Sequence, residues 1–291
     1  MSNKRKFKDL TIRDNFMFAA VMMQGDNCKR FLEMLLGINI KEIVISQEKS
    51  LIYNPEYKGV RLDVYANDEN NTRYDIEMQV AEQKLGKRIR YYHSQMDMEL
   101  LESGHKYKEL PASYVIFICD FDPFNKRKNC YTFETRCAEE PELSLGDNSI
   151  SIVLSTEGEN AESVSKELKD FLAFVKEDNP ENNSKSEDKY VYQLQQSIRS
   201  VKENRKLERS FMTWIDIRDE IRDEIREEVR AEGILESKRE SVLDLLSELG
   251  EIPEEIKNVI MSETRIDVLK TMIKIAAKTT AFSDFKEKIL K

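Results

Sequence analysis

The chain has 291 residues, 40% of them apolar and 35% charged, which is enough for one large or two modest domains. Its net charge of −9 excludes a general polyanion binder, so any contact with nucleic acid must use a local basic patch. The four cysteines lack the CxxC spacing of a zinc site, and no apolar run reaches transmembrane length, so we expect reduced thiols, a cytoplasmic location and no membrane contact.

The first half of the chain predicts helices that alternate with strands. A helix is expected from Asn15 to about Leu36, where Gly37 closes it, and a strand is expected over 42–46. Two alternating runs, Val60–Ala66 and Tyr74–Val80, flank a turn-rich pentapeptide and predict a β-hairpin. The elements expected after the hairpin are a helix over 85–103, a buried uncharged strand over 114–119, strands over 131–137 and 149–154, and an amphipathic helix over 161–178.

The polar stretch 179–186 predicts a linker, and everything after it is helical in pattern. We therefore predict an α/β domain over 1–180, followed over 187–291 by a long charged helix and a small helical bundle. Four tetrads, from Ile217 to Glu232, repeat an aliphatic residue every four positions. They favour equally a solvated helix and a self-association surface, so a homo-oligomer formed through the C-terminal helices is one expectation.

The hairpin carries a group of polar side chains on one face. Strand alternation places Asp63, Glu77 and Gln79 together, and if Ala66 pairs with Tyr74 then Asp63 lies opposite Glu77. Two carboxylates that close repel each other unless a cation lies between them. Mg²⁺, or Mn²⁺ in its place, prefers such oxygen ligands and would activate water for attack on a phosphodiester. Gln79 would orient that water or contact the phosphate, because an amide cannot act as a base.

Spacing alone favours a simpler interpretation, in which these acids form the solvated face of a hairpin. The segment that follows shifts the balance toward a binding site, because residues 83–96 contain no acidic residue. We expect its four cations to hold DNA phosphates beside the carboxylates: Lys84, Lys87, Arg88 and Arg90. The interleaved Tyr91, Tyr92 and His93 fit either phosphate binding or core packing, since Tyr92 and Met96 lie one turn apart.

Three segments together resemble the Rpn family of recombination-promoting nucleases, also described as PD-(D/E)XK nuclease family transposases. They are Arg61-Leu62-Asp63-Val64, Ile76-Glu77-Met78-Gln79 and Arg88-Ile89-Arg90-Tyr91-Tyr92. The opening from Leu10 to Phe16 is similar to the start of that family, and the resemblance covers residues 7 to about 125.

The resemblance implies a restriction-endonuclease-like mixed sheet with flanking helices, and a nuclease linked to DNA recombination, mobility or defence. It implies that Asp63 and Glu77 bind the metal and that Gln79 stands where the superfamily usually has lysine. Lys84 or Arg88 could supply the missing cation. Asp14 could be a further acidic residue on the first helix, although a helix N-cap explains it equally well.

We therefore predict a magnesium-dependent DNA endonuclease with Asp63, Glu77 and Gln79 at its catalytic centre. The absence of lysine at position 79 supports one alternative, a nuclease-like fold that binds DNA without cutting it. The tetrads support another, an oligomeric interaction protein that acts through its tail.

Overall fold

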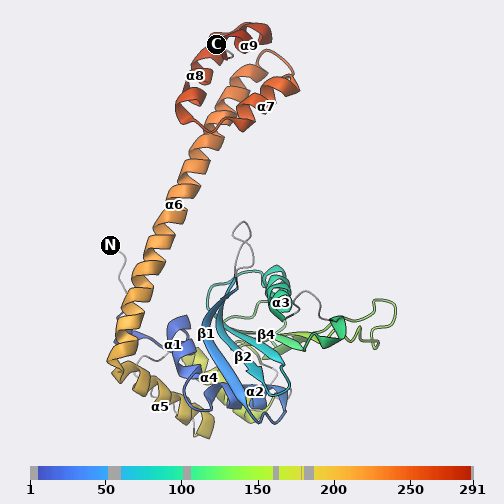
Figure 1. Ribbon diagram of the computed structural model, residues 1–291, viewed down its shortest axis with the longest axis vertical. Coiled ribbons are helices and arrows are strands. Elements are labelled where there is room, and N and C mark those ends of the chain that lie inside the picture. The colour runs from blue at the N-terminus through green and yellow to red at the C-terminus, as the bar shows by residue number, and fades with distance from the viewer. Residues whose placement is uncertain are drawn as a thin grey trace. The chain divides into compact units, whose positions relative to one another are not determined.

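The computed structural model describes the backbone of residues 6–51, 60–100, 106–159, 164–177, 179 and 187–289, and the side chains of these residues except 47–51, 60–61, 214 and 217–229. The chain forms two compact units, Met1–Phe211 and Met212–Lys291. The first unit is built on a mixed sheet, and the second is helical (Figure 1).

The sheet has six strands in the order β1-β2-β3-β4-β6-β5. Their bounds are β1 Ile43–Leu51, β2 Val60–Asp68, β3 Arg73–Gln79, β4 Ser113–Cys119, β5 Cys130–Phe133 and β6 Ser149–Ser155. The pairs β1/β2, β2/β3 and β5/β6 are antiparallel, whereas β3/β4 and β4/β6 are parallel. A parallel neighbour requires a crossover connection, and helix α3 (Gly86–Leu100) lies within the one that joins β3 to β4. The uncharged strand β4 is central, as its composition predicted.

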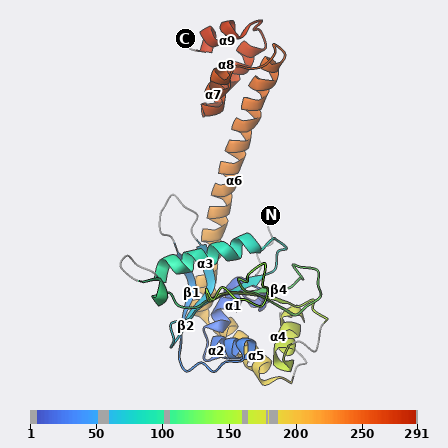
Figure 2. The same ribbon diagram turned by 90° about the vertical axis from the view of Figure 1, so that its right-hand side faces the viewer.

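Helices cover both faces of the sheet (Figure 2). Helix α3 lies on one face, where Ile89, Tyr92 and Met96 pack with Val115 and Phe117 of β4. The helices on the other face are α1 Asn15–Met22, α2 Asn27–Leu36, α4 Lys166–Glu177 and α5 Lys189–Glu203. Two single turns of 3₁₀ helix, Phe7–Asp9 and Tyr107–Glu109, complete the described elements of this unit. The fold is thus the predicted mixed sheet with flanking helices.

The prediction of one helix from Asn15 to Leu36 is wrong, because the chain forms two helices with a break over 23–26. Gly25 lies in the break with a φ of 51°, a left-handed conformation that favours glycine and interrupts the helical path. Gly37, with a φ of 67°, ends the second helix as predicted. The apolar pattern continued through the break because residues Phe16–Met22 and the inner face of α2 are all buried.

Several other boundaries differ from those expected. The first strand extends to Leu51, the strand predicted over 131–137 ends at Phe133, and the helix predicted over 161–178 is α4. Within the expected linker only residue 179 is among the described residues.

Helix α5 belongs to the first unit, so the two units divide between Phe211 and Met212 rather than at the change in composition near residue 187. Its apolar face packs against α1, α2 and α4, and the Tyr190 hydroxyl donates to the Asn27 carbonyl at 2.9 Å. Phe211 closes the unit, with its ring centroid 5.2 Å from that of Phe16. The boundary is therefore set by long-range packing.

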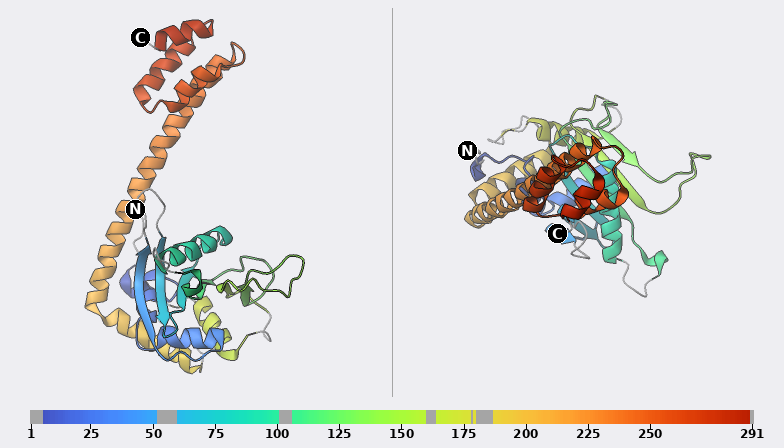
Figure 3. Two further views of the ribbon diagram at one scale, coloured as in Figure 1. Left: turned by 45° about the vertical axis from the view of Figure 1, so that its right-hand side comes forward. Right: turned by 90° about the horizontal axis from the view of Figure 1, so that it is seen from above.

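The second unit is a small helical bundle (Figure 3). It is built from the end of the 43-residue helix α6 (Arg205–Ser247) together with α7 (Glu254–Ser262), α8 (Ile266–Ala276) and α9 (Phe282–Ile289). Leu246, Ile260, Leu269 and Phe285 are completely buried in its core. Gly250 and Pro253 separate α6 from α7, as predicted. The tetrads lie within α6, but most of their side chains are outside the described set, so self-association through them stays a prediction. Among the described residues, no helix combines the length and apolar character that a membrane span would require.

Candidate active site

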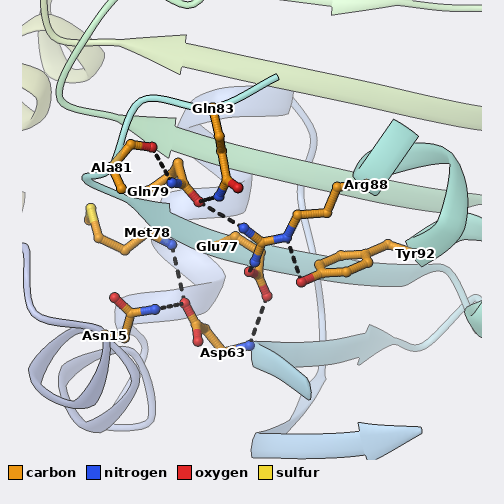
Figure 4. A network of polar contacts seen from close by, with 9 residues as sticks. All are labelled: Asn15, Asp63, Glu77, Met78, Gln79, Ala81, Gln83, Arg88 and Tyr92. Atoms are coloured by element: carbon orange, nitrogen blue, oxygen red, sulfur yellow. Dashed lines mark hydrogen bonds and ion pairs between the residues drawn. The ribbon is translucent and has the colours of Figure 1, made fainter. Parts of the chain in front are cut away.

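The register of the hairpin brings the predicted acids together. Ala66 pairs with Tyr74, and Val64 pairs with Ile76, so the next position along places Asp63 opposite Glu77. The Asp63 backbone N–H donates to Glu77 Oε1 at 3.0 Å (Figure 4). Both side chains are buried, with 9% of Asp63 and 1% of Glu77 exposed. The structure therefore confirms the pairing on which the sequence argument rested, and it places the acids beneath α3 and away from bulk water.

Asp63 is held from both sides. Its Oδ2 accepts a hydrogen bond from Asn15 Nδ2 at 2.8 Å and another from the Met78 backbone N–H at 3.4 Å. Asn15 is the first residue of α1, so the start of that helix orients a carboxylate 48 residues away in sequence. The sequence reading missed Asn15, because an amide at a helix start has no pattern that identifies its partner.

Asp14, the accessory acid suggested by the sequence, occupies the N-cap position of α1 but makes no side-chain hydrogen bond to the helix amides. Its Oδ2 accepts from the Thr11 backbone N–H at 2.8 Å and closes the turn before the helix. The structure thus brings Asn15 to Asp63, and the accessory role of Asp14 stays a prediction.

Arg88 joins the acids from α3. Its Nη2 donates to Glu77 Oε2 at 2.5 Å, its Nη1 donates to Gln79 Oε1 at 2.8 Å, and its Nε donates to the Tyr92 hydroxyl at 2.7 Å (Figure 4). The guanidinium carbon also lies 5.0 Å from the centroids of the Tyr92 and Phe117 rings. Arg88 was expected among the cations that contact DNA, and the structure places it inside the carboxylate cluster.

Gln79 is fully engaged in the same network. Its Nε2 donates to the Ala81 carbonyl, and its Oε1 accepts from both Arg88 and Gln83 Nε2, the latter at 3.0 Å. Only 6% of the residue is exposed. In this arrangement the uncharged Gln79 side chain contacts the Arg88 guanidinium through its Oε1.

Asp75 is a third acid on the same face of β3, two residues before Glu77. It is completely buried, and its carboxyl group lies within hydrogen-bonding reach of the Glu77 carboxyl, so the two acids can share a proton. Burial raises its pKa well above the ordinary value, and the charges of Glu77 and Asp63 raise it further. Burial likewise raises the pKa of Glu77 to about 8, with the Asp63 charge adding to the effect and Arg88 opposing it. Strand alternation explains why Asp75 lies on this face, whereas its complete burial could not be read from the sequence.

The donor set fits a divalent metal ion. The cluster presents hard oxygen ligands, and three carboxyl groups face a single guanidinium, so an added cation would relieve their repulsion. In the described part of the chain, no three His, Cys, Asp or Glu side chains are grouped as a complete metal cage. Mg²⁺ does not require one, because it is usually held by one or two carboxylates together with water and substrate phosphate. Asp63 and Glu77 are the residues that would hold it.

The remaining basic residues of this segment lie outside the cluster. Lys84, Lys87 and Arg90 are exposed, and none forms an ion pair with another described residue. The neighbouring aromatic residue Tyr92 is buried, with its ring 6.1 Å from that of Phe117, which confirms the core-packing interpretation. His93 lies between the hydroxyls of Ser113 and Ser151, and burial lowers its pKa to about 4, so it is neutral at physiological pH.

A comparison with protein families found one match. The family described as PD-(D/E)XK nuclease family transposase matches residues 16–228, a range that contains all six strands of the sheet together with Asp63, Glu77, Gln79 and Arg88. Searches of the curated proteins and of the solved structures found no match. Since the match spans most of the chain and includes the hairpin that carries the opposed acids, this protein belongs to the PD-(D/E)XK nuclease family transposases.

Proposed function

We propose that this protein is a magnesium-dependent endonuclease that hydrolyses phosphodiester bonds in the DNA backbone. Family membership supports a nuclease that acts on DNA and uses a divalent metal. The observation that carries the finer proposal is the buried pair Asp63 and Glu77, which lie opposite each other on one sheet face with Asp75 alongside. Such a concentration of buried carboxyl groups, whose raised pKa values show that ionising them is costly, is explained if it serves to hold a cation.

Each residue of the cluster has a role in this proposal. Asp63 and Glu77 hold the ion, and Asn15 fixes the orientation of the Asp63 carboxylate. A divalent ion bound there would lower the pKa of a water molecule that it binds. The positive charge of the ion would also lie beside the scissile phosphate. Gln79 holds Arg88 next to the acids, so a permanently charged group remains near the reacting phosphate.

DNA contact falls to the exposed cations beside the cluster, Lys84, Lys87 and Arg90. They form a local positive segment on a chain of net charge −9, so DNA is attracted to this part of the protein and repelled by the acidic remainder. Because the matched family is described by the word transposase, we further propose that cleavage serves DNA recombination or mobility.

The test uses supercoiled plasmid DNA, which has no ends, so any cleavage of it is endonucleolytic. The full-length protein is incubated with the plasmid in Mg²⁺ and, separately, in EDTA. Asp63→Asn and Glu77→Gln keep the shape of each side chain and remove its charge. Glu159→Gln is the matched control, because Glu159 is an exposed acid, with 65% of its side chain accessible.

We expect nicked or linear plasmid from the native protein and from Glu159→Gln in Mg²⁺ only. Asp63→Asn and Glu77→Gln should each cleave at least about 100-fold more slowly, because a missing metal ligand removes the activated water. Binding of a DNA duplex in EDTA, measured by gel mobility shift, should persist in both variants. Cleavage by both variants at the native rate would refute the catalytic assignment. Binding by the native protein with no cleavage would instead support a nuclease-like fold that binds DNA without cutting it.

A further inference from the structure

Arg88 contacts one of the two carboxylates that would hold a metal ion. Glu77 has two carboxylate oxygens: Oε1 accepts the Asp63 backbone N–H, and Oε2 accepts Arg88 Nη2 at 2.5 Å. The oxygen of Glu77 that points away from the strand backbone is therefore already neutralised by a guanidinium. A divalent ion and this guanidinium repel each other, so they cannot both bind the same oxygen closely without cost.

We propose that Arg88 competes with the divalent metal for Glu77 and that, once released from Glu77, Arg88 is the catalytic cation that Gln79 does not supply. This inference rests on the proposed nuclease function and adds to it an exchange, in which the metal ion replaces Arg88 on Glu77. In the absence of metal Arg88 neutralises Glu77. With metal on Glu77, Arg88 turns its free Nη2 edge toward the scissile phosphate, with which a guanidinium forms strong charge-assisted hydrogen bonds.

The contacts of Arg88 explain why it stays in the site after it leaves Glu77. Two of its three hydrogen bonds, to Gln79 and to the Tyr92 hydroxyl, do not involve Glu77 at all. Its guanidinium also packs over the rings of Tyr92 and Phe117, which restricts how far it can swing. The Arg88 side chain is 30% exposed, so solvent reaches part of it even while it is bound to Glu77.

The exchange links metal binding to DNA binding. A phosphate that draws Arg88 away from Glu77 makes that carboxylate available, and by thermodynamic linkage a bound metal strengthens the interaction of Arg88 with phosphate. Lys84 cannot take this role in the same way, because it is exposed and forms no hydrogen bond to the cluster. The protein would thus hold its metal tightly only when DNA is present.

The test measures Mn²⁺ affinity of the full-length protein without DNA, from the electron paramagnetic resonance signal of the free ion. The variants are Arg88→Gln, which removes the charge, and Arg88→Lys, which keeps the charge but cannot bridge Glu77 and Gln79. Arg136→Gln is the matched control, because Arg136 forms a comparable arginine–glutamate pair, 2.9 Å from Glu134, on the surface. Plasmid cleavage in Mg²⁺ is measured in parallel.

We expect Arg88→Gln to bind Mn²⁺ about tenfold more tightly than the native protein and to cleave at least about 100-fold more slowly. Arg88→Lys should have a Mn²⁺ affinity and a cleavage rate between those of Arg88→Gln and the native protein. Arg136→Gln should match the native protein in both measurements. Unchanged or weaker Mn²⁺ binding by Arg88→Gln would overturn the competition, and native cleavage by it would overturn the catalytic role. If Arg88→Gln does not unfold cooperatively on heating, Arg88→Lys takes its place in the test. Unchanged or weaker Mn²⁺ binding by Arg88→Lys would then overturn the competition, and native cleavage by it would overturn the catalytic role.

Asp63→Asn separates this inference from the proposed function. If the native protein and Asp63→Asn bind Mn²⁺ equally, the metal site itself is refuted, and the inference fails with it. If Asp63→Asn loses Mn²⁺ binding while Arg88→Gln binds as the native protein does, the nuclease proposal stands and only the exchange is overturned.

Discussion

Replacing Asp75 with asparagine tests whether the buried acid cluster is maintained at the expense of stability. Asp75 is completely buried, and its pKa is raised well above the ordinary value of 3.8, first by burial and then by Glu77 and Asp63. The native state therefore binds a proton that the unfolded chain releases above about pH 4. Under that condition the free energy of unfolding falls as the pH rises.

The magnitude depends on the range between the ordinary pKa of 3.8 and the raised pKa of the folded state. Within that range each pH unit lowers the free energy of unfolding by about 1.4 kcal/mol. Asparagine needs no proton, so this pH-dependent cost is absent in Asp75→Asn. The stability of Asp75→Asn relative to the native protein should therefore improve as the pH rises from 5 to 7, by up to about 1.4 kcal/mol per pH unit.

The measurement is urea unfolding in EDTA at both pH values, followed by the near-ultraviolet circular dichroism of tyrosine. All eleven tyrosines precede residue 212, so this signal reports the first unit. Glu159→Gln, which changes an exposed carboxyl, is the control for general effects of charge. A stability difference between Asp75→Asn and the native protein that is the same at pH 5 and pH 7 would refute the reasoning.

Three further predictions concern the hydrogen bond from Asn15 to Asp63, the DNA contact and the helical bundle. Asn15→Ala removes the 2.8 Å hydrogen bond to Asp63 and should weaken Mn²⁺ binding about tenfold. Asp14→Asn, which alters the turn at Thr11, is the control and should leave Mn²⁺ binding unchanged. Equal Mn²⁺ affinities of Asn15→Ala and the native protein would exclude Asn15 from metal binding. Lys87→Gln and Arg90→Gln should each lower the slope of log affinity against log salt by about one, and an unchanged slope in a gel-shift titration would place the DNA elsewhere. Phe285→Ala empties a fully buried position in the second unit and should cost roughly 3–5 kcal/mol of unfolding free energy, with the tyrosine-reported transition of the first unit unchanged. A shift in that transition would show that the two units unfold together.

The local pattern of the chain was sufficient for the hairpin and for the pairing of its acids. Side chains alternate strictly along a strand, and the short turn between the two runs determines which residues lie opposite each other. Asp63, Glu77 and Gln79 therefore had to share a face once the register was known. The uncharged run of β4 similarly predicted its central place, because strands covered on both faces are usually rich in apolar residues.

Only the tertiary structure decided which other residues reach the acids. Arg88 was one of four cations in its segment, and it alone points to Glu77, because burial of Ile89, Tyr92 and Met96 sets the rotation of α3 against the sheet. Asn15 reaches Asp63 because α1 packs across β2, an arrangement that no local spacing encodes. The same holds for α5, whose buried face assigns it to the first unit. Periodicity determines the direction of a side chain within its own element, whereas the residue that it meets depends on how distant elements pack together.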